Sequence, residues 1–225
     1  MDIDRLIFSF FNAKVAAEAW PDIAKGFWIT LGLGLAVIVS GLALGLLLAL
    51  ARSFRKRSAN FFIVVFADVM RALPPLAIII IFFFAFPYIG WPMSAFTATW
   101  LALSLILAAF SEEIFWAGII AVPKGQWEAA RSTGMSAWQT LVYVVVPQAV
   151  RMTIPPLTNR TIAITKGTAL GSVVALSEIL GASSSATSNL GNATPLMIGA
   201  ALYLVLFIPF VWFGRWVETR YAWKR

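Results

Sequence analysis

The chain has 225 residues, of which 60% are hydrophobic and 12% are charged, and its formal net charge is +7. The apolar share exceeds that of a typical soluble domain and indicates an integral membrane protein. The sequence has no cysteine and no histidine, which excludes disulfides, thiol catalysis and histidine acid–base chemistry. The basic residues form short clusters between apolar runs, a pattern that argues against nucleic-acid binding.

The first 25 residues alternate between apolar and charged side chains. Leu6, Ile7 and Phe8 are followed by Lys14 and Glu18 before any long apolar run begins. This pattern predicts an amphipathic N-terminal helix lying on the membrane surface. The alternative is a poorly ordered tail.

Five apolar runs follow, each long enough to cross the hydrocarbon core of a bilayer as a helix. We expect transmembrane helices over residues 27–51, 61–87, 94–122, 153–181 and 195–213. The predicted fold is therefore all-α, with five transmembrane helices in a single domain that covers residues 1–225. Residues 181–195 are small, polar and uncharged, and we expect them to form an external loop.

Basic residues are distributed unevenly between the two sides of these spans. Loops 52–60 and 123–152, the start of the fourth span and the tail hold twelve of them: Arg52, Arg55, Lys56, Arg57, Lys124, Arg131, Arg151, Arg160, Arg215, Arg220, Lys224 and Arg225. The other side has three, namely Arg5, Lys14 and Lys25. Because positive residues favour the cytoplasmic side, the N-terminus is predicted outside and the C-terminus inside.

The polar loop 123–150 has the signals of two short helices. Residues 125–133 favour a helix, and Gly134 suits the left-handed position that follows a helix end. Ser136 and Gln139 have the spacing of a capping box and predict a second helix start. Trp127, Ala129 and Ala130 give the first helix a small apolar face. Such a helix can dock in a partner's groove or lie on lipid, and its physical properties do not choose between the two.

Several motifs occur in a fixed order along the chain. One set resembles the EAA loop of ABC importer permeases, namely Glu128-Ala129-Ala130, Gly134 and Val144-x-Val146-Pro147. The two valines stand where the family usually has isoleucine and leucine. Gly125-Gln126 and Pro147-Gln148-Ala149 resemble the polar amino acid subfamily. Further matches are Thr30-Leu31, Arg52-Ser53, Arg71-Ala-Leu-Pro-Pro-Leu76, Glu113-Ile114 with Gly118-Ile119, and Lys166-Gly-Thr-Ala-Leu170. The resemblance covers residues 20–220.

The resemblance implies the transmembrane subunit of an ATP-driven amino acid importer in the bacterial inner membrane. The cytoplasmic loop would couple to a separate ABC ATPase dimer through six residues: Gln126, Trp127, Glu128, Ala129, Ala130 and Gly134. A periplasmic solute-binding protein would deliver the substrate, and a second permease, in a heterodimer rather than a homodimer, would complete the pathway. No cofactor is expected in this chain, because the partner ATPase would bind ATP and Mg²⁺.

Ionisable residues inside the predicted spans need partners, because each is costly in the hydrocarbon core. Asp68 and Arg71 are three residues apart and are expected to pair. The candidate substrate pathway consists of Arg71, Glu112, Glu113, Lys166 and Thr168. Two of the departures from the family pattern are Glu112, where alanine is usual, and Trp116, where arginine is usual.

These departures have two interpretations. They retune a substrate cavity, with Glu112 favouring a cationic amino acid or an unusual amino acid derivative, or they pair charges anew across a subunit interface. Other function classes are a permease of the same family for another small polar solute, an intramembrane enzyme and a passive channel. The sequence has no Walker-type phosphate loop, so the chain is not expected to hydrolyse ATP.

Overall fold

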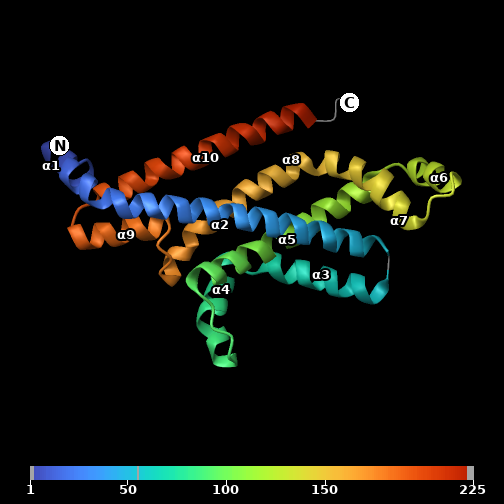
Figure 1. The fold of residues 1–225 in the computed structure, drawn as a ribbon, viewed down its shortest axis with the longest axis horizontal. Helices are drawn as coiled ribbons and strands as arrows, with labels where there is room; N and C mark the ends of the chain where they lie inside the picture. Colours follow the sequence, from blue (N-terminus) through green and yellow to red (C-terminus); the bar gives the residue numbers. More distant parts are fainter. Residues whose placement is uncertain (1–2, 55, 222–225) are drawn as a thin grey trace. The chain divides into compact units, whose positions relative to one another are not determined.

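A computed structural model describes residues 3–54 and 56–221. Arg55, Lys224 and Arg225 of the basic clusters lie outside these residues. The described chain consists of helices joined by short turns (Figure 1). The helices are α1 (Ile3–Phe10), α2 (Ala13–Ser53), α3 (Arg57–Ala72), α4 (Pro75–Ile80), η1 (Ile81–Ala85), η2 (Phe86–Ile89), α5 (Ala95–Ala121), α6 (Lys124–Ser132), α7 (Ala137–Gln139), η3 (Thr140–Val145), α8 (Val146–Thr165), η4 (Lys166–Val174), α9 (Ile179–Leu190) and α10 (Thr194–Tyr221).

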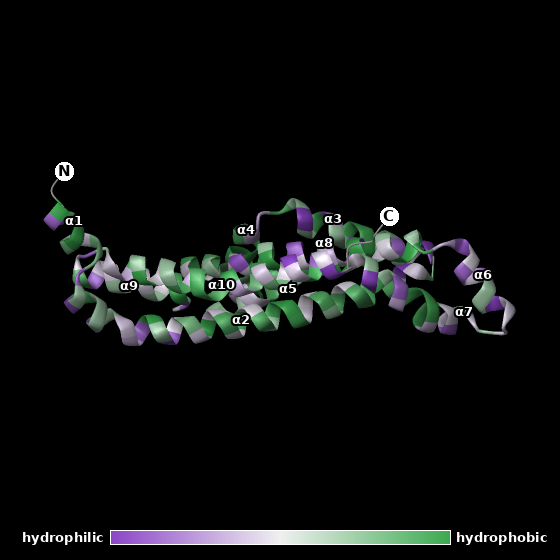
Figure 2. Ribbon diagram, turned by 90° about the horizontal axis from the view of Figure 1, so that it is seen from above, coloured by the Kyte–Doolittle hydropathy of each residue, from purple (hydrophilic) through white to green (hydrophobic). Residues whose placement is uncertain are grey.

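Among the described residues, four helical stretches are long and apolar enough to cross a membrane. A fifth is added if α3 and the helical segment after it count as one broken span. The all-helical fold with four to five candidate spans agrees with the expectation from the sequence. Figure 2 shows α2 mostly in hydrophobic colours and α6 mostly in hydrophilic ones.

The second predicted span is broken at its two prolines. Leu73 ends α3 in an extended conformation with ψ 137°, and Pro74 is also extended with ψ 135°. A residue before proline avoids the helical region because the proline ring crowds its backbone. Pro75 then starts α4 at a position that tolerates proline. The predicted span 61–87 is therefore bent: α3 and the helical segment Pro75–Ile89 meet at 103°, as a broken span or a re-entrant loop would.

The predicted N-terminal helix is interrupted near its middle. α1 ends at Phe10, and Asn12 accepts bonds from the backbone N–H groups of Lys14 (3.1 Å) and Val15 (3.3 Å), which caps the start of α2. Residues 13–25 thus belong to the same helix as the first predicted span. α1 keeps the exposed apolar side chains expected of a surface helix, among them Ile3 and Phe8.

Two expectations for the second half of the chain were also wrong. The second helix of the polar loop is not short, because α7, η3 and α8 form a continuous helical stretch from Ala137 to Thr165. The predicted external loop 181–195 is largely helical, because α9 covers Ile179–Leu190. Between them, the 3₁₀ helix η4 ends at Val174 and is followed by Ala175, which has a positive φ of 59°.

The chain groups into two compact units. Unit 1 comprises Met1–Val37, Pro74–Leu103 and Ile164–Val211. Ala19 and Ile23 of α2 form its buried cluster with Ala182 of α9, and Leu202 of α10 packs against them. The backbone N–H of Ala193 donates to the Ser9 carbonyl at 3.0 Å. The N-terminal segment is therefore fastened to the turn between α9 and α10.

Unit 2 comprises Ile38–Leu73, Ser104–Ala163 and Trp212–Arg225. Its apolar core contains Ala49 of α2, Phe115 of α5, Val145 of η3 and Leu157 of α8. Close backbone approach is needed at Gly45, where an added Cβ would lie 2.5 Å from the Ser111 Cβ and 2.9 Å from the Ala108 carbonyl oxygen. Gly45 therefore allows α2 and α5 to pack closely.

Candidate functional site

The turn between α6 and α7 has the local structure that its sequence predicts. Gly134 has φ +88°, a conformation that strains any residue with a side chain. The Ser136 hydroxyl accepts a bond from the Gln139 N–H at 3.2 Å, and the Gln139 side chain accepts one from the Ser136 N–H at 2.8 Å. This capping box and the left-handed glycine fix where α6 ends and where the next helix begins.

Not all of the six predicted coupling residues are exposed on α6 and the turn after it. Gln126, Glu128 and Ala129 are exposed, as is Gly134 after the helix. Ala130 is buried, with 7% of its surface accessible, so it faces its own chain and not outward.

Trp127 is half-buried against the apolar core of unit 2. The Gln126 side-chain carbonyl accepts a bond from the Gln148 amide at 3.4 Å. Two of the six predicted coupling residues, Trp127 and Ala130, therefore anchor α6, while the other four are accessible to a partner.

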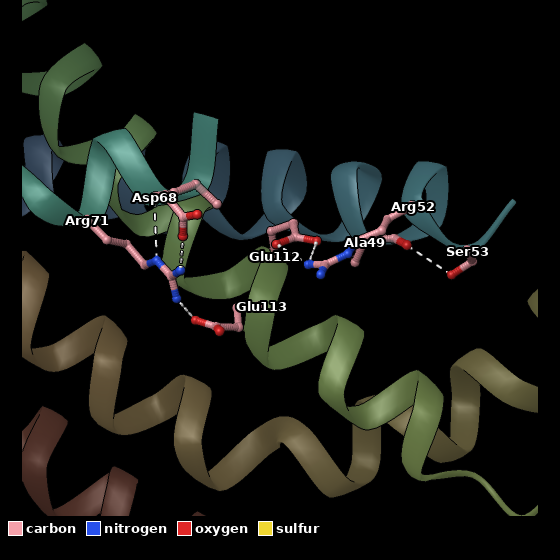
Figure 3. A network of polar contacts seen from close by, with 8 residues as sticks. Ala49, Arg52, Ser53, Asp68, Arg71, Glu112 and Glu113 are labelled. Carbon is pink, nitrogen blue, oxygen red and sulfur yellow. Dashed lines mark hydrogen bonds and ion pairs between the residues drawn. The ribbon is translucent and has the colours of Figure 1, made fainter. Parts of the chain in front are cut away.

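Arg52 binds Glu112 near the end of α2 (Figure 3). Its Nη1 donates to both carboxylate oxygens of Glu112 at 3.0 and 3.2 Å. The Glu112 side chain is fully buried, and that of Arg52 is 22% exposed. The guanidinium also lies 4.8 Å from the centre of the Trp116 ring, within cation–π range. Glu112 is therefore neutralised within the chain and is not a free carboxylate in this structure.

Arg71 forms a second charge cluster in unit 2, shown in Figure 3. Its Nη2 donates to the Asp68 carboxylate at 2.5 Å, which confirms the predicted pair, and its Nη1 pairs with Glu113. The Glu113 side chain is 54% exposed. Of the candidate pathway residues, Arg71 and Glu113 thus meet directly, and both keep some accessible surface.

The remaining pathway candidates, Lys166 and Thr168, lie in unit 1 on η4. Lys166 is exposed, whereas Thr168 is fully buried. The Thr168 hydroxyl is one of the buried polar atoms that find no hydrogen-bond partner among the described residues. A 3₁₀ helix of nine residues is unusually long, and such stretches often mark hinges or strain.

Unit 1 contains a fully buried carboxyl group, Glu178, which lies within the fourth predicted span, 153–181. Glu178 accepts hydrogen bonds from the Tyr203 hydroxyl at 2.5 Å, the Thr30 hydroxyl at 3.4 Å and the Gly181 N–H at 2.8 Å. The network joins α2, α9 and α10. A signal for it was the tyrosine in the otherwise apolar run of α10, since buried tyrosine hydroxyls usually find a partner.

A family model described as the inner membrane component of binding-protein-dependent transport systems matches residues 41–223. The chain belongs to this family. The probable amino-acid ABC transporter permease YckA of Bacillus subtilis (strain 168) is 38% identical over 170 residues, covering 76% of this chain and 75% of that protein. The L-cystine permease TcyB of the same strain is 36% identical, covering 73% and 70%.

Similar proteins also cover nearly the whole chain. The glutamine permease GlnP of Escherichia coli (strain K12) is 30% identical over 93% of this chain and 97% of that protein. A crystal structure of an amino acid ABC transporter superposes with a TM-score of 0.80, at 30% identity over 91% of this chain and 96% of that one. The methionine transporter MetNI, in an inward-facing conformation, has a TM-score of 0.62 at 19% identity, covering 90% and 95%, and supports the fold alone.

Proposed function

We propose that this chain is the membrane subunit of an ATP-driven importer that moves a polar amino acid into the cytoplasm by alternating access. The observation that carries the proposal is the family match over residues 41–223, supported by relatives named as glutamine, cystine and amino-acid permeases. The deciding experiment is an ATPase assay of the reconstituted complex with its binding protein against an amino acid panel. Absence of stimulation by every amino acid would contradict the proposal.

The partners follow from the same assignment. A cytoplasmic ABC ATPase dimer would supply the ATP and Mg²⁺ sites, a solute-binding protein would deliver the substrate outside, and a second permease would complete the pathway. The heterodimer remains the favoured assembly. The proposed location is the bacterial inner membrane, with the N-terminus outside and the C-terminus inside, as the distribution of basic residues supports.

The proposed coupling surface is the exposed face of α6 together with the turn at Gly134. Gln126, Glu128 and Ala129 are exposed there, while Trp127 and Ala130 fasten the helix to unit 2. A motion of the ATPase that pushes α6 would therefore be passed to the core between α5 and α8. Glu128-Ala129-Ala130 and Gly134 of this loop resemble the EAA loop of ABC importer permeases, which supports the proposal.

Changes on this face should separate ATP hydrolysis from uptake. We expect Ala129→Trp and Glu128→Ala to lower substrate uptake per ATP hydrolysed, because they alter an exposed docking surface without disturbing the core. The measurement compares uptake and ATPase rates in the same proteoliposomes. Ser132→Ala, on the same helix, is the matched control. Unchanged uptake with both substitutions would exclude this role for α6.

The substrate would pass Arg71, Glu113, Lys166 and Thr168 in our proposal, with Glu112 acting through its pairing to Arg52 and not as a direct contact. Arg71 and Lys166 suit a substrate carboxylate, and Glu113 suits an ammonium group. Glu113→Gln removes the negative charge that would bind the substrate ammonium group. The variant should therefore need a higher substrate concentration for half-maximal ATPase stimulation. An unchanged concentration dependence would remove Glu113 from the pathway.

A further inference from the structure

Arg160 of α8 is an exposed arginine at the depth of a membrane span in unit 2. Its guanidinium carbon lies 3.9 Å from the centre of the Phe110 ring on α5, so the two side chains are at the same level. Phe110 is about three helical turns, or about 16 Å, before the end of α5 at Ala121. In a hydrocarbon core of about 30 Å this level is close to the middle. A charged side chain there needs a partner or water.

The structure gives Arg160 no acidic partner. It forms no ion pair with any other residue in the part of the chain that the structure describes. The neighbouring Asn159 donates to the Glu218 carboxylate of α10 at 2.5 Å, so this acid binds the amide and not the guanidinium. Arg160 is therefore a cation within a span whose counterion comes from elsewhere.

The contact with Phe110 positions the guanidinium without using its hydrogen-bond donors. A cation–π contact involves the flat face of the group, whereas the N–H donors point outward in its plane. These donors form the planar fork that binds a carboxylate through two parallel hydrogen bonds. The ring thus holds Arg160 in place and leaves its anion-binding edge available.

The face of α5 that carries Phe110 also carries an acid. Glu113 is three residues further along the helix, a spacing that puts the two Cβ atoms about 5–6 Å apart. Glu113 forms an acidic cluster with Asp68 and Arg71, in which two acids share one base (Figure 3). A cation at Arg160 and an acidic cluster therefore lie along one face of α5. The carboxylate and ammonium of an α-amino acid are attached to one carbon and match this pair.

We infer that Arg160 is a further residue of the substrate pathway and binds the α-carboxylate of the amino acid, while the acidic cluster receives its ammonium group. The inference rests on the proposed function, which makes this face part of a water-filled pathway. Arg71 already donates to Asp68 and Glu113, so a carboxylate would compete with two acids there. At Arg160 a carboxylate binds without displacing an ion pair.

The test uses the complete transport complex in nanodiscs and phenylglyoxal, a reagent selective for arginine side chains. Mass spectrometry measures the modification of Arg160 relative to that of Arg220, an exposed arginine on α10 that corrects for consumed reagent. The amino acids of the ATPase panel are added, among them L-glutamine, L-lysine and L-glutamate, but not arginine, which reacts itself. Each is compared with its α-amide, which keeps the ammonium group but lacks the carboxylate.

We expect the amino acid that stimulates the ATPase to protect Arg160. At ten times the concentration that halves the modification, the modification should fall about tenfold, as mass action requires. The α-amide should need a concentration about tenfold to hundredfold higher, because it offers the guanidinium no charged acceptor.

Variants connect the protection to transport. Arg160→Gln should raise the amino acid concentration for half-maximal ATPase stimulation about tenfold or more, and Arg160→Lys should raise it less. Phe110→Leu keeps the arginine but removes the ring, so protection should need a concentration about twofold to fivefold higher. Arg151→Gln, an exposed arginine on the same helix, is the matched control and should leave both concentrations unchanged.

Three results would overturn the inference. An Arg160 that is unreactive in the assembled complex without amino acid is covered by another chain, such as the second permease. Protection by more anionic lipid alone would identify a lipid phosphate as its anion. Equal protection by amino acid and α-amide, or none by either, would show that the carboxylate is not bound there. Amino-acid-stimulated ATPase activity in the same preparation tests the proposed function separately, since stimulation without protection of Arg160 removes only this inference.

Discussion

Glu112 and Trp116, two residues that depart from the family pattern, form one cluster in the structure. Both contact Arg52, the acid through a buried ion pair and the indole through its ring face. Together the two residues hold the Arg52 side chain between α2 and α5 within unit 2. From the sequence alone, these charges have two interpretations, a retuned substrate cavity or pairing across a subunit interface. The partner lies in the same chain, which the sequence could not indicate because residues 52 and 112 are distant in it.

Removing one member of this ion pair should be more harmful than removing both. Arg52→Met alone leaves the Glu112 carboxylate buried without a counterion, at a cost of about 3–5 kcal/mol in unfolding free energy. The double variant Arg52→Met with Glu112→Met should recover most of this loss. The measurement is thermal unfolding of the purified complex, with Asp68→Asn as the control because Asp68 is 60% exposed. Equal losses in the single and double variants would contradict the buried pair.

The Tyr203 hydroxyl should stabilise unit 1 through its bond to Glu178. Tyr203→Phe keeps the ring but removes the donor that lies 2.5 Å from the carboxyl oxygen, and leaves that buried oxygen poorly satisfied. We expect a loss of about 1–3 kcal/mol in unfolding free energy. Tyr88→Phe is the matched control, since Tyr88 is 92% exposed and should tolerate the change. If both variants unfold at the same temperature as the wild type, the network contributes no stability.

At the scale of helices, local signals predicted the structure well where one residue decides the backbone. Gly134 and the pair Ser136 and Gln139 fixed the turn after α6 as expected. α9 was missed because its composition is typical of a loop, and its helix is stabilised by burial of Ile179, Ala182 and Ser183. The break between α3 and α4 falls at Pro74 and Pro75, where the proline rings exclude a continuous helix.

Helix contacts in unit 2 should be sensitive to single methyl groups at glycines. In Gly118→Ala the new Cβ would lie 2.4 Å from the Thr153 Cγ2 and 3.0 Å from the Ala149 carbonyl oxygen. Because α5 and α8 must separate to relieve this contact, we expect a loss of about 1–3 kcal/mol in unfolding free energy. Gly125→Ala is the control, as its Cβ would meet nothing within 4 Å and alanine favours the helix. A stable Gly118→Ala complex would show that the two helices are not closely packed.

At the scale of the whole molecule, family membership and membrane orientation rest on different observations. The match over residues 41–223 assigns the chain to permeases without locating either terminus. Orientation is inferred from the distribution of basic residues between the loops, and contacts between helices carry no information about it. The orientation determines which surfaces of the chain face a cytoplasmic ATPase and which face an external binding protein. α6 can contact an ATPase only if the loop 123–150 lies on the cytoplasmic side of the membrane.

Single cysteines provide the test of this orientation, because the native chain has none. Ser58→Cys at the start of α3 and Ser132→Cys on α6 should react with a membrane-impermeant maleimide only in inside-out vesicles. Ser94→Cys before α5 and Ser188→Cys on α9 should react only in intact spheroplasts. All four serines are exposed, so accessibility within the fold does not bias the comparison. Labelling of Ser132→Cys from outside would reverse the proposed topology and remove α6 from the ATPase. Labelling of Ser188→Cys from the inside alone would place α9 on the cytoplasmic surface and contradict the external position that the span count requires.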